Sequence, residues 1–221
     1  MIAQFVLFDG FDPLDALAPY EVLHAGGLAS EGAVQVEFVS AEGAREVPSG
    51  VPGVSLRATA VLDPDRADLV VLPGAAGRLP TGDERDLEDD AIPAILGRAI
   101  QTELAALLKA VVERDGVILA TVCGGSLIPA LTGLTEGRPA TTNRNGGLDV
   151  LDATGTVAVD ARVVDDNDLI TASGVTSGLD LGLHLLDREI GSRVALAVEK
   201  LFEYERRGIV WRADGVEPVA L

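Results

Sequence analysis

Cysteine is nearly absent from this sequence, since Cys123 is the only one among 221 residues. An internal disulfide is therefore impossible, and such sparse cysteine is typical of a protein kept in the reducing cytoplasm. No apolar run reaches the ~18 residues of a membrane-spanning helix. The first residues, Met1 to Phe5, carry neither the basic segment nor the long apolar segment of a signal peptide. These absences predict a cytoplasmic protein that does not span a membrane.

Basic residues are also scarce, because 17 lysines and arginines stand against 35 acidic residues and give a net charge of −18. A surface this acidic repels phosphate groups, so we expect neither a nucleic acid nor an anionic membrane as a partner. The acidic residues are scattered rather than gathered in a tail, which indicates a solvated surface. A salt-adapted host and a high-GC genome would each produce this composition, and neither points to a function.

Metal and nucleotide motifs are lacking as well. The sequence spacing of His24, Cys123 and His184 is too wide to indicate a zinc site. No glycine-rich phosphate loop follows a predicted strand. Nothing in the pattern places either histidine beside Cys123, so a Cys-His relay is unsupported. We therefore expect neither a metal nor another cofactor.

What the sequence does contain is a regular alternation of strand-like apolar runs with helical patterns, which favours an α/β fold around a mostly parallel sheet. Strands are expected over residues 3–8, 34–39, 54–62 (or a hairpin there), 69–72, 117–122, 138–142, 161–164 and 169–172. Helices are expected from residue 14 to a stop near Gly26, then over 95–113, from 127 onward, 178–190 and 192–205. We interpret residues 1–221 as one domain that ends in an irregular tail, about 206–221.

The most informative motif surrounds Cys123. A buried strand is predicted to end at Val122, the small residues Gly124 and Gly125 follow, and a helical pattern begins at Leu127. This is the layout of a nucleophile elbow, in which a tight strand-to-helix turn exposes a reactive side chain. The N-terminus of the following helix is expected to lower the pKa of the thiol. An inert, packed cysteine fits the same pattern, and the motif alone does not decide between the two interpretations.

Two other segments could complete a site. Pro73-Gly74-Ala75 follows a second buried strand, and its backbone N–H groups could form an oxyanion hole with the N–H of Gly124. Asp15 follows the first strand at the start of an apolar helix. Each feature also has a purely structural interpretation. Pro73-Gly74-Ala75 could be an ordinary strand-to-helix turn, and Asp15 could be a first-turn aspartate favoured by the helix dipole. Asp12 is interpreted as a helix-capping residue.

These segments together resemble the ThiJ/PfpI superfamily, whose fold is that of the class I glutamine amidotransferases and which includes the Parkinsonism-associated deglycase. Within it the chain is most similar to the isonitrile hydratase-like branch. The resemblance spans nearly the whole chain, and four stretches carry it: FDGFDPLDALAPYEVL at residues 8–23, LVVLPGAAG at 69–77, VCGGSL at 122–127 with GRPATT at 137–142, and SGVTSGLDL at 173–181.

The resemblance implies a flavodoxin-like three-layer sandwich with the elbow at the carboxyl end of a central strand. It implies a reactive Cys123 hydrogen-bonded to Asp15, and N–H donors for the substrate at Gly74, Ala75 and Gly124. It also implies a homodimer with the site near the interface. The same domain forms the N-terminal half of some AraC-type regulators, although the acidic charge of this chain argues against DNA.

Three positions depart from the family pattern. The hydratases usually carry threonine where this chain has Gly124, many members carry histidine where it has Asn143, and Ala75 replaces a glycine. Asn143 is expected to be an oxyanion- or substrate-binding residue, together with Gly74, Ala75 and Gly124.

The leading hypothesis is hydration of an isonitrile to an N-substituted formamide. Cys123 would form a thioimidate and Asp15 would transfer protons. Since like charges resist joint ionisation, the two groups should share a proton or the pKa of the acid should be raised. The alternatives are a glyoxalase or deglycase acting on small dicarbonyls, against which Asn143 weighs, a cysteine redox sensor, and a small-molecule binding protein.

Overall fold

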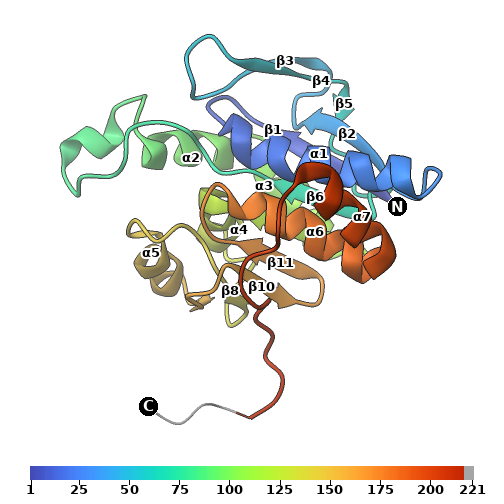
Figure 1. The fold of residues 1–221 in the computed structure, drawn as a ribbon. Helices are drawn as coiled ribbons and strands as arrows, with labels where there is room; N and C mark the ends of the chain where they lie inside the picture. Colours follow the sequence, from blue (N-terminus) through green and yellow to red (C-terminus); the bar gives the residue numbers. More distant parts are fainter. Residues whose placement is uncertain (217–221) are drawn as a thin grey trace.

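A seven-stranded sheet forms the centre of the computed structural model, which describes residues 1–216 except the side chain of Asp86 (Figure 1). The strand order is β10-β11-β7-β6-β1-β2-β5, and every neighbouring pair is parallel except β10 and β11. The strands span Ile2–Leu7 (β1), Gln35–Ser40 (β2), Ala60–Val61 (β5), Leu69–Leu72 (β6), Ile118–Val122 (β7), Val163–Asp166 (β10) and Leu169–Ala172 (β11). The strands expected over residues 161–164 and 169–172 correspond to β10 and β11, which form an antiparallel hairpin.

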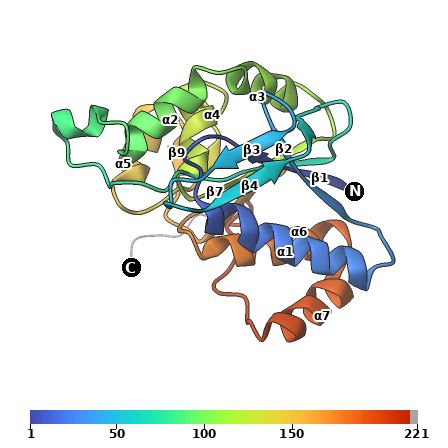
Figure 2. The same ribbon diagram turned by 90° about the horizontal axis from the view of Figure 1, so that it is seen from above.

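Helices cover both faces of this sheet, as Figure 2 shows. On one face lie α1 (Pro13–Ala29), α6 (Ser177–Glu189) and α7 (Ser192–Phe202), and on the other lie α2 (Ile92–Ile100), α3 (Leu104–Val112) and α4 (Leu127–Leu131). Side chains of β6 alternate between the two cores, because Leu69 and Val71 pack into one while Val70 and Leu72 pack into the other. The predicted three-layer α/β sandwich with a mostly parallel sheet is confirmed.

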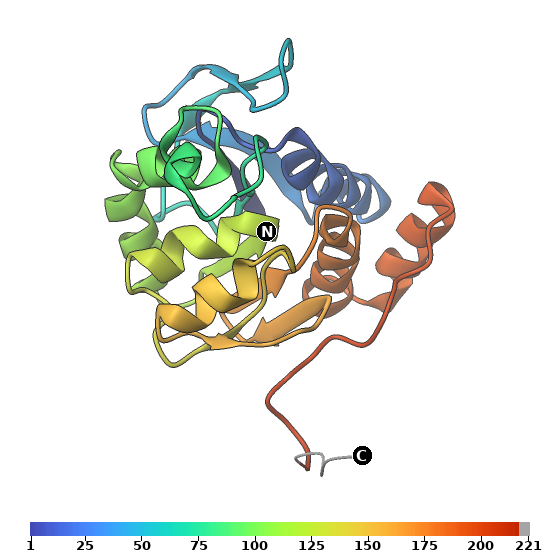
Figure 3. The ribbon, with the colours of Figure 1, turned by 90° about the vertical axis from the view of Figure 1, so that its left-hand side faces the viewer.

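Smaller elements decorate the sheet. A hairpin of β3 (Arg45–Pro48) and β4 (Ser55–Ala58) projects beyond it, at the top of Figures 1 and 3. Helix α5 (Gly147–Ala153) lies near the two-stranded pair of β8 (Pro139–Ala140) and β9 (Val157–Ala158). Two 3₁₀ helices, η1 (Glu84–Leu87) and η2 (Cys123–Ser126), complete the described elements. The sequence pattern missed β3, α5 and β9, which are short and carry weak periodicity.

Helix α1 corrects one prediction, because it does not stop at Gly26 but continues to Ala29. Gly26 and Gly27 serve close packing rather than termination. A Cβ on Gly26 would lie 2.3 Å from the side chain of Leu186, and one on Gly27 would lie 2.3 Å from the carbonyl oxygen of Val34. Each glycine inside the helical pattern therefore marks a close approach of another segment, α6 at Gly26 and the residue before β2 at Gly27, which only the tertiary structure reveals.

The single helix expected over residues 95–113 is also corrected, since the structure breaks it into α2 and α3. The break lies at Thr102. Its hydroxyl donates to the carbonyl of Ala99 at 2.8 Å and accepts from the N–H of Leu104 at 3.2 Å. A threonine that supplies a local partner to the backbone competes with helix continuation, and this explains why unbroken apolar spacing was misleading. Pro93 lies in the first turn of α2, where its missing N–H leaves no helical hydrogen bond unmade.

After α7 the chain returns along the outer edge of the sheet. The backbone of Trp211 pairs with β10, donating to the carbonyl of Val163 and accepting from the N–H of Asp165. Arg212 adds an ion pair to the Asp165 carboxylate at 3.0 Å. Within the described part of the predicted tail, residues 206–216, Trp211 and Arg212 therefore bind to β10. Residues 217–221 lie outside the described residues. Within residues 1–216, no helix has both the length and the apolar character needed to cross a membrane.

Candidate functional site

Three neighbouring strands deliver the candidate site residues to one edge of the sheet. Because β1, β6 and β7 are adjacent and parallel, the loops that follow their carboxyl ends meet there. Asp15 follows β1, Gly74 follows β6 and Cys123 follows β7. The backbone N–H of Gly74 donates to Asp15 Oδ2 at 3.0 Å, and a Cβ on Gly74 would lie 2.7 Å from the backbone nitrogen of Gly124. The three segments singled out in the sequence are thus in contact.

Cys123 has a strained backbone, with φ of 55° in the left-handed region. Non-glycine residues persist in this region only where surrounding interactions hold them. Here the hydroxyl of Thr142 donates to the carbonyl of Cys123 at 2.6 Å. The hydroxyl of Ser126 lies 2.6 Å from that of Thr121 and donates to the carbonyl of Thr141 at 2.7 Å. The turn therefore has the geometry of a nucleophile elbow, fixed by hydroxyl groups on both sides.

Gly125 is required by this turn, whereas Gly124 is not. A Cβ on Gly125 would lie 2.3 Å from the carbonyl oxygen of Leu72. This distance is too short for two atoms that are not bonded, so the backbone would have to move. At Gly124 the nearest atom to a Cβ is 3.7 Å away, in ordinary van der Waals contact.

Gly125→Ala should therefore destabilise the protein by about 1–3 kcal/mol, the usual cost of overpacking. Gly124→Ala is the matched control and should unfold close to the wild-type temperature. Thermal unfolding of the two variants checks this, at about 2–4 °C for each kcal/mol in a chain of this size. Equal midpoints for both variants would contradict the close approach of the elbow to β6.

The Asp15 carboxyl group is fully buried. Its Oδ2 accepts the hydrogen bond from Gly74, and its Oδ1 is a buried atom without a hydrogen-bond partner among the described residues. Burial raises the pKa of Asp15 well above 3.8, the negative charge of Asp12 raises it further, and the Gly74 hydrogen bond partly opposes both. Because its N–H is bound to Asp15, Gly74 is not the free substrate donor that the resemblance implied, but a residue that holds the acid.

The Cys123 thiol behaves differently from the prediction. Burial raises its pKa to about 12, the charges of Asp15 and Asp12 add to the effect, and the hydrogen bond from Gly124 N–H opposes it. The expected lowering by a helix N-terminus is therefore wrong, because α4 has only five residues and the burial and charge effects are larger. The expected raising of the acid's pKa is confirmed. Both groups resist ionisation, so Asp15 and Cys123 together carry at most one negative charge near neutral pH.

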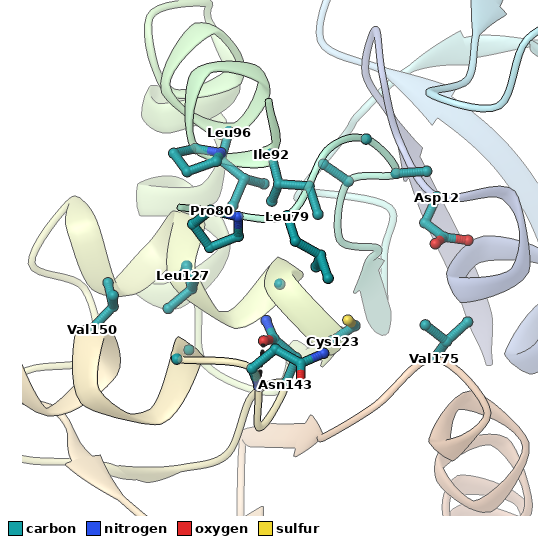
Figure 4. Close-up of a pocket in the computed structure, with 18 of the residues that line it drawn as sticks. Asp12, Leu79, Pro80, Ile92, Leu96, Cys123, Leu127, Asn143, Val150 and Val175 are labelled. Carbon is teal, nitrogen blue, oxygen red and sulfur yellow. Dashed lines mark hydrogen bonds between the residues drawn. The ribbon is translucent and has the colours of Figure 1, made fainter. Parts of the chain in front are cut away.

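A cavity of about 500 Å³ opens onto Cys123 (Figure 4). This volume lies in the usual range for small-molecule sites, about 300–1,000 Å³. Most of its wall is apolar and comes from five separate segments: Leu79 and Pro80, Ile92 and Leu96, Leu127 and Leu131, Val150, and Val175. The polar lining consists of Asp12, Cys123, Asn143 and Asn145. The cavity therefore suits a small, largely hydrophobic molecule that presents one reactive group to the thiol.

The other predicted binding residues line the same cavity. Ala75 forms an antiparallel bridge with Phe11 in which the flanking residues make the hydrogen bonds, so its own N–H is directed away from Phe11. Asn143 Oδ1 accepts from the N–H of Asn145 at 3.1 Å, which leaves the Nδ2 group as its donor. That nitrogen lies 3.9 Å from the Cβ position of Gly124. Ala75, Gly124 and Asn143 thus share the cavity wall with Cys123, and among them the Gly124 N–H hydrogen-bonds to the thiol.

The histidines and Asp12 complete the comparison with the sequence. Neither His24 nor His184 lines the cavity. His184 is buried, and its Nε2 lies 2.7 Å from Asp165 Oδ2. Asp12 caps α1 as predicted, accepting from the N–H of Leu14 at 2.9 Å, but it also lines the cavity, which the sequence interpretation missed. Its place in the loop after β1 was the available signal. Within residues 1–216, no three His, Cys, Asp or Glu side chains group as a metal site requires.

Comparison with known proteins agrees with this architecture. The model of the DJ-1/PfpI family matches residues 97–188. The chain is 32% identical over 203 residues to isonitrile hydratase from Pseudomonas putida, an alignment that covers 90% of this chain and 77% of that protein. It is 33% identical over 110 residues to the HTH-type transcriptional regulator GbdR from Pseudomonas aeruginosa, covering 49% of this chain and 30% of the regulator.

A solved structure shows the same fold. A ThiJ/PfpI family protein from Pseudomonas syringae superposes with a TM-score of 0.74 at 24% identity, covering 94% of this chain and 76% of that one. The fold alone does not assign the chain to a family, but the match to isonitrile hydratase is long enough and similar enough to do so. The chain belongs to the DJ-1/PfpI family.

Proposed function

We propose that this protein is an isonitrile hydratase-like enzyme, which adds water to an isonitrile and releases an N-substituted formamide. The observation that carries the proposal is that Cys123 lines an apolar cavity while the charge of the buried Asp15 acts directly on its thiol. The hydrogen bond between the two groups that the resemblance implied is not formed, because Oδ2 of Asp15 accepts from Gly74 and Oδ1 has no partner among the described residues. The similarity to isonitrile hydratase over 77% of that enzyme supports it. The departures at Gly124 and Asn143 remove a hydroxyl and an imidazole from the family pattern, and the reaction below needs neither.

The substrate properties fit the cavity. An isonitrile is uncharged, and its terminal carbon accepts a nucleophile. Its substituent would occupy the apolar space between Leu79, Leu127 and Val150. The terminal carbon would then lie towards Cys123, where Asn143 can donate a hydrogen bond to the nitrogen as charge develops on it.

In the first half of the reaction the thiol adds to the isonitrile. The Cys123 proton moves to the Asp15 carboxylate, and the sulfur forms a bond to the terminal carbon. Asp15 then delivers that proton to the same carbon, which gives a thioimidate, Cys123–S–CH=N–R, and restores the carboxylate. The raised pKa of Asp15 makes its carboxylate a better proton acceptor than that of an exposed aspartate.

In the second half water replaces the sulfur. Asp15 accepts a proton from the attacking water, the oxygen bonds to the thioimidate carbon, and the proton passes to nitrogen. The tetrahedral adduct collapses by breaking its carbon–sulfur bond, while the hydroxyl proton returns through Asp15 to the leaving sulfur. The products are R–NH–CHO and the free Cys123 thiol, so one isonitrile and one water are consumed in each cycle.

Mass spectrometry of formamide tests the proposal. The purified protein, incubated with a panel of uncharged alkyl and aryl isonitriles at two salt concentrations, should produce the matching formamides. Heat-denatured protein gives the background rate. No formamide from any member of the panel, with folding verified by circular dichroism at both salts, would refute the proposal. The same samples supplied with methylglyoxal would then test dicarbonyl chemistry.

A second candidate is a binding protein that does not turn its ligand over. The similarity to the transcriptional regulator GbdR over 49% of this chain favours it. Calorimetric binding of an isonitrile without formamide formation would support this candidate over the enzyme.

The homodimer, the cytoplasmic location and the single domain over residues 1–221 stay predictions from the sequence.

A further inference from the structure

Asp12 places a carboxylate on the wall of the cavity. Its Oδ1 accepts from the backbone N–H groups of Leu14 at 2.9 Å and Asp15 at 3.4 Å, which fixes the side chain at the N-terminus of α1. Figure 4 shows the Asp12 carboxylate on the side of the cavity where Cys123 and Val175 lie. A helix N-terminus stabilises a negative charge at this position. The cavity therefore contains a fixed anion that the proposed reaction does not use.

No positive group balances this charge inside the cavity. The described lining contains no lysine, arginine or histidine, and its other polar members are Cys123, Asn143 and Asn145. Most of the remaining wall is hydrocarbon, which solvates charge poorly. An anion entering the cavity would lose water, meet the carboxylate of Asp12 and find no cation.

We propose that Asp12 is a specificity-determining residue that makes the site select against anions, so that uncharged or cationic small molecules reach Cys123. This inference rests on the proposed function for the identity of the reaction, and it limits the substrates to isonitriles without a carboxylate or phosphate. The selection itself depends on the cavity and its charge, so it can be measured without turnover.

Alkylation of Cys123 provides that measurement. Iodoacetamide and iodoacetate are similar in size and differ in charge, and each can modify only one cysteine in this chain. Their rate ratio at Cys123, followed by intact mass and divided by the ratio for a small free thiol, reports the selection. The wild-type ratio should favour iodoacetamide by at least about tenfold, within the range expected for repulsion at a partly buried site.

Asp12→Asn should reduce this preference by about fivefold or more. The amide oxygen of asparagine still caps the helix, so the fold is preserved. Asp9→Asn is the matched control: it removes the same charge from the same loop, but Asp9 is an exposed partner of Arg45 and does not line the cavity. Its ratio should equal that of the wild type.

A second readout follows the pH dependence of alkylation. Burial is the largest cause of the raised pKa of Cys123, and the charge of Asp15 and, to a smaller extent, that of Asp12 raise it further. Asp12→Asn should therefore shift the rise in iodoacetamide reactivity to lower pH, and Asp9→Asn should not.

The inference would be overturned by equal ratios in wild type and Asp12→Asn, or by an equal loss of selection in Asp9→Asn. It would also be overturned by a thiol that reacts with neither reagent even at an alkaline pH where the thiol ionises, since the cavity would then not admit the probes. Failure of isonitrile turnover would refute the proposed function and leave the alkylation ratios unaffected. Conversely, turnover of a carboxylate-bearing isonitrile at the rate of its methyl ester would overturn the charge selection alone.

Discussion

Cys123→Ala is expected to lower formamide production by at least about 10³-fold, because removal of the nucleophile eliminates the thioimidate route. Alanine keeps the Cβ of the elbow and the same backbone strain at φ of 55°, so the fold should be unchanged. Cys123→Ser should be almost as inactive, since a buried hydroxyl is a much weaker nucleophile than a thiol beside Asp15. Formamide measured by mass spectrometry under saturating isonitrile checks both variants.

Intact mass provides the complementary result. During turnover the wild-type protein should gain the mass of one isonitrile, on Cys123, and the adduct should be absent from Cys123→Ala. Residual turnover above about one tenth of the wild-type rate in a folded Cys123→Ala protein would contradict covalent catalysis. The cavity would then be activating water directly, and the cysteine would have another role.

That the candidate site residues lie close together could be predicted from the sequence, because each of them follows the end of a predicted strand. Asp15, Gly74 and Cys123 each follow an apolar run, and parallel strands place such positions on one edge of the sheet. The roles of these residues were harder to predict. The N–H of Gly74 binds Asp15 rather than the substrate, and this depends on a contact between residues 59 positions apart.

The predicted direction of the pKa shift of the Cys123 thiol was wrong, again because it depends on tertiary contacts. A local rule, the helix N-terminus, predicts a lower value, but burial and the charges of Asp15 and Asp12 raise it. The cavity wall could not be predicted either, since it combines residues such as Leu79, Ile92 and Val150 from segments that the sheet brings together. Gly26 could not be interpreted from the sequence either. A glycine that allows close packing against Leu186 looks the same in the sequence as a glycine that ends a helix.

These observations change how the thiol must be activated. A cysteine with a depressed pKa attacks as a resident thiolate, whereas Cys123 must lose its proton to Asp15 as the substrate arrives. The carboxylate is the proposed acceptor, and its burial makes it more basic than an exposed aspartate. The burial of Asp15 is therefore part of the proposed catalytic function, and it should lower the stability of the folded protein.

Asp15→Asn is expected to reveal both effects. The amide still accepts the Gly74 hydrogen bond but can no longer take a proton, so formamide production should fall by about 10²–10⁴-fold. The same variant should be more stable than wild type at pH 8, by on the order of 1 kcal/mol, which corresponds to about 2–4 °C in the midpoint of thermal unfolding. Loss of activity with gain of stability distinguishes a costly functional group from a structural one.

The sign follows from proton linkage. The folded-state pKa of Asp15 lies above 3.8, so folding is favoured by its protonated form. That stability is fully present below the ordinary aspartate value and is lost as the pH rises through the raised folded pKa. The advantage of Asp15→Asn should therefore be absent near pH 3.5, grow above pH ~4 and be complete above the raised pKa. Asp115→Asn, at an exposed position, should show no such pH dependence. An Asp15→Asn variant that is equally destabilised at both pH values would instead make Asp15 a structural residue, and the proton transfers would need another carrier.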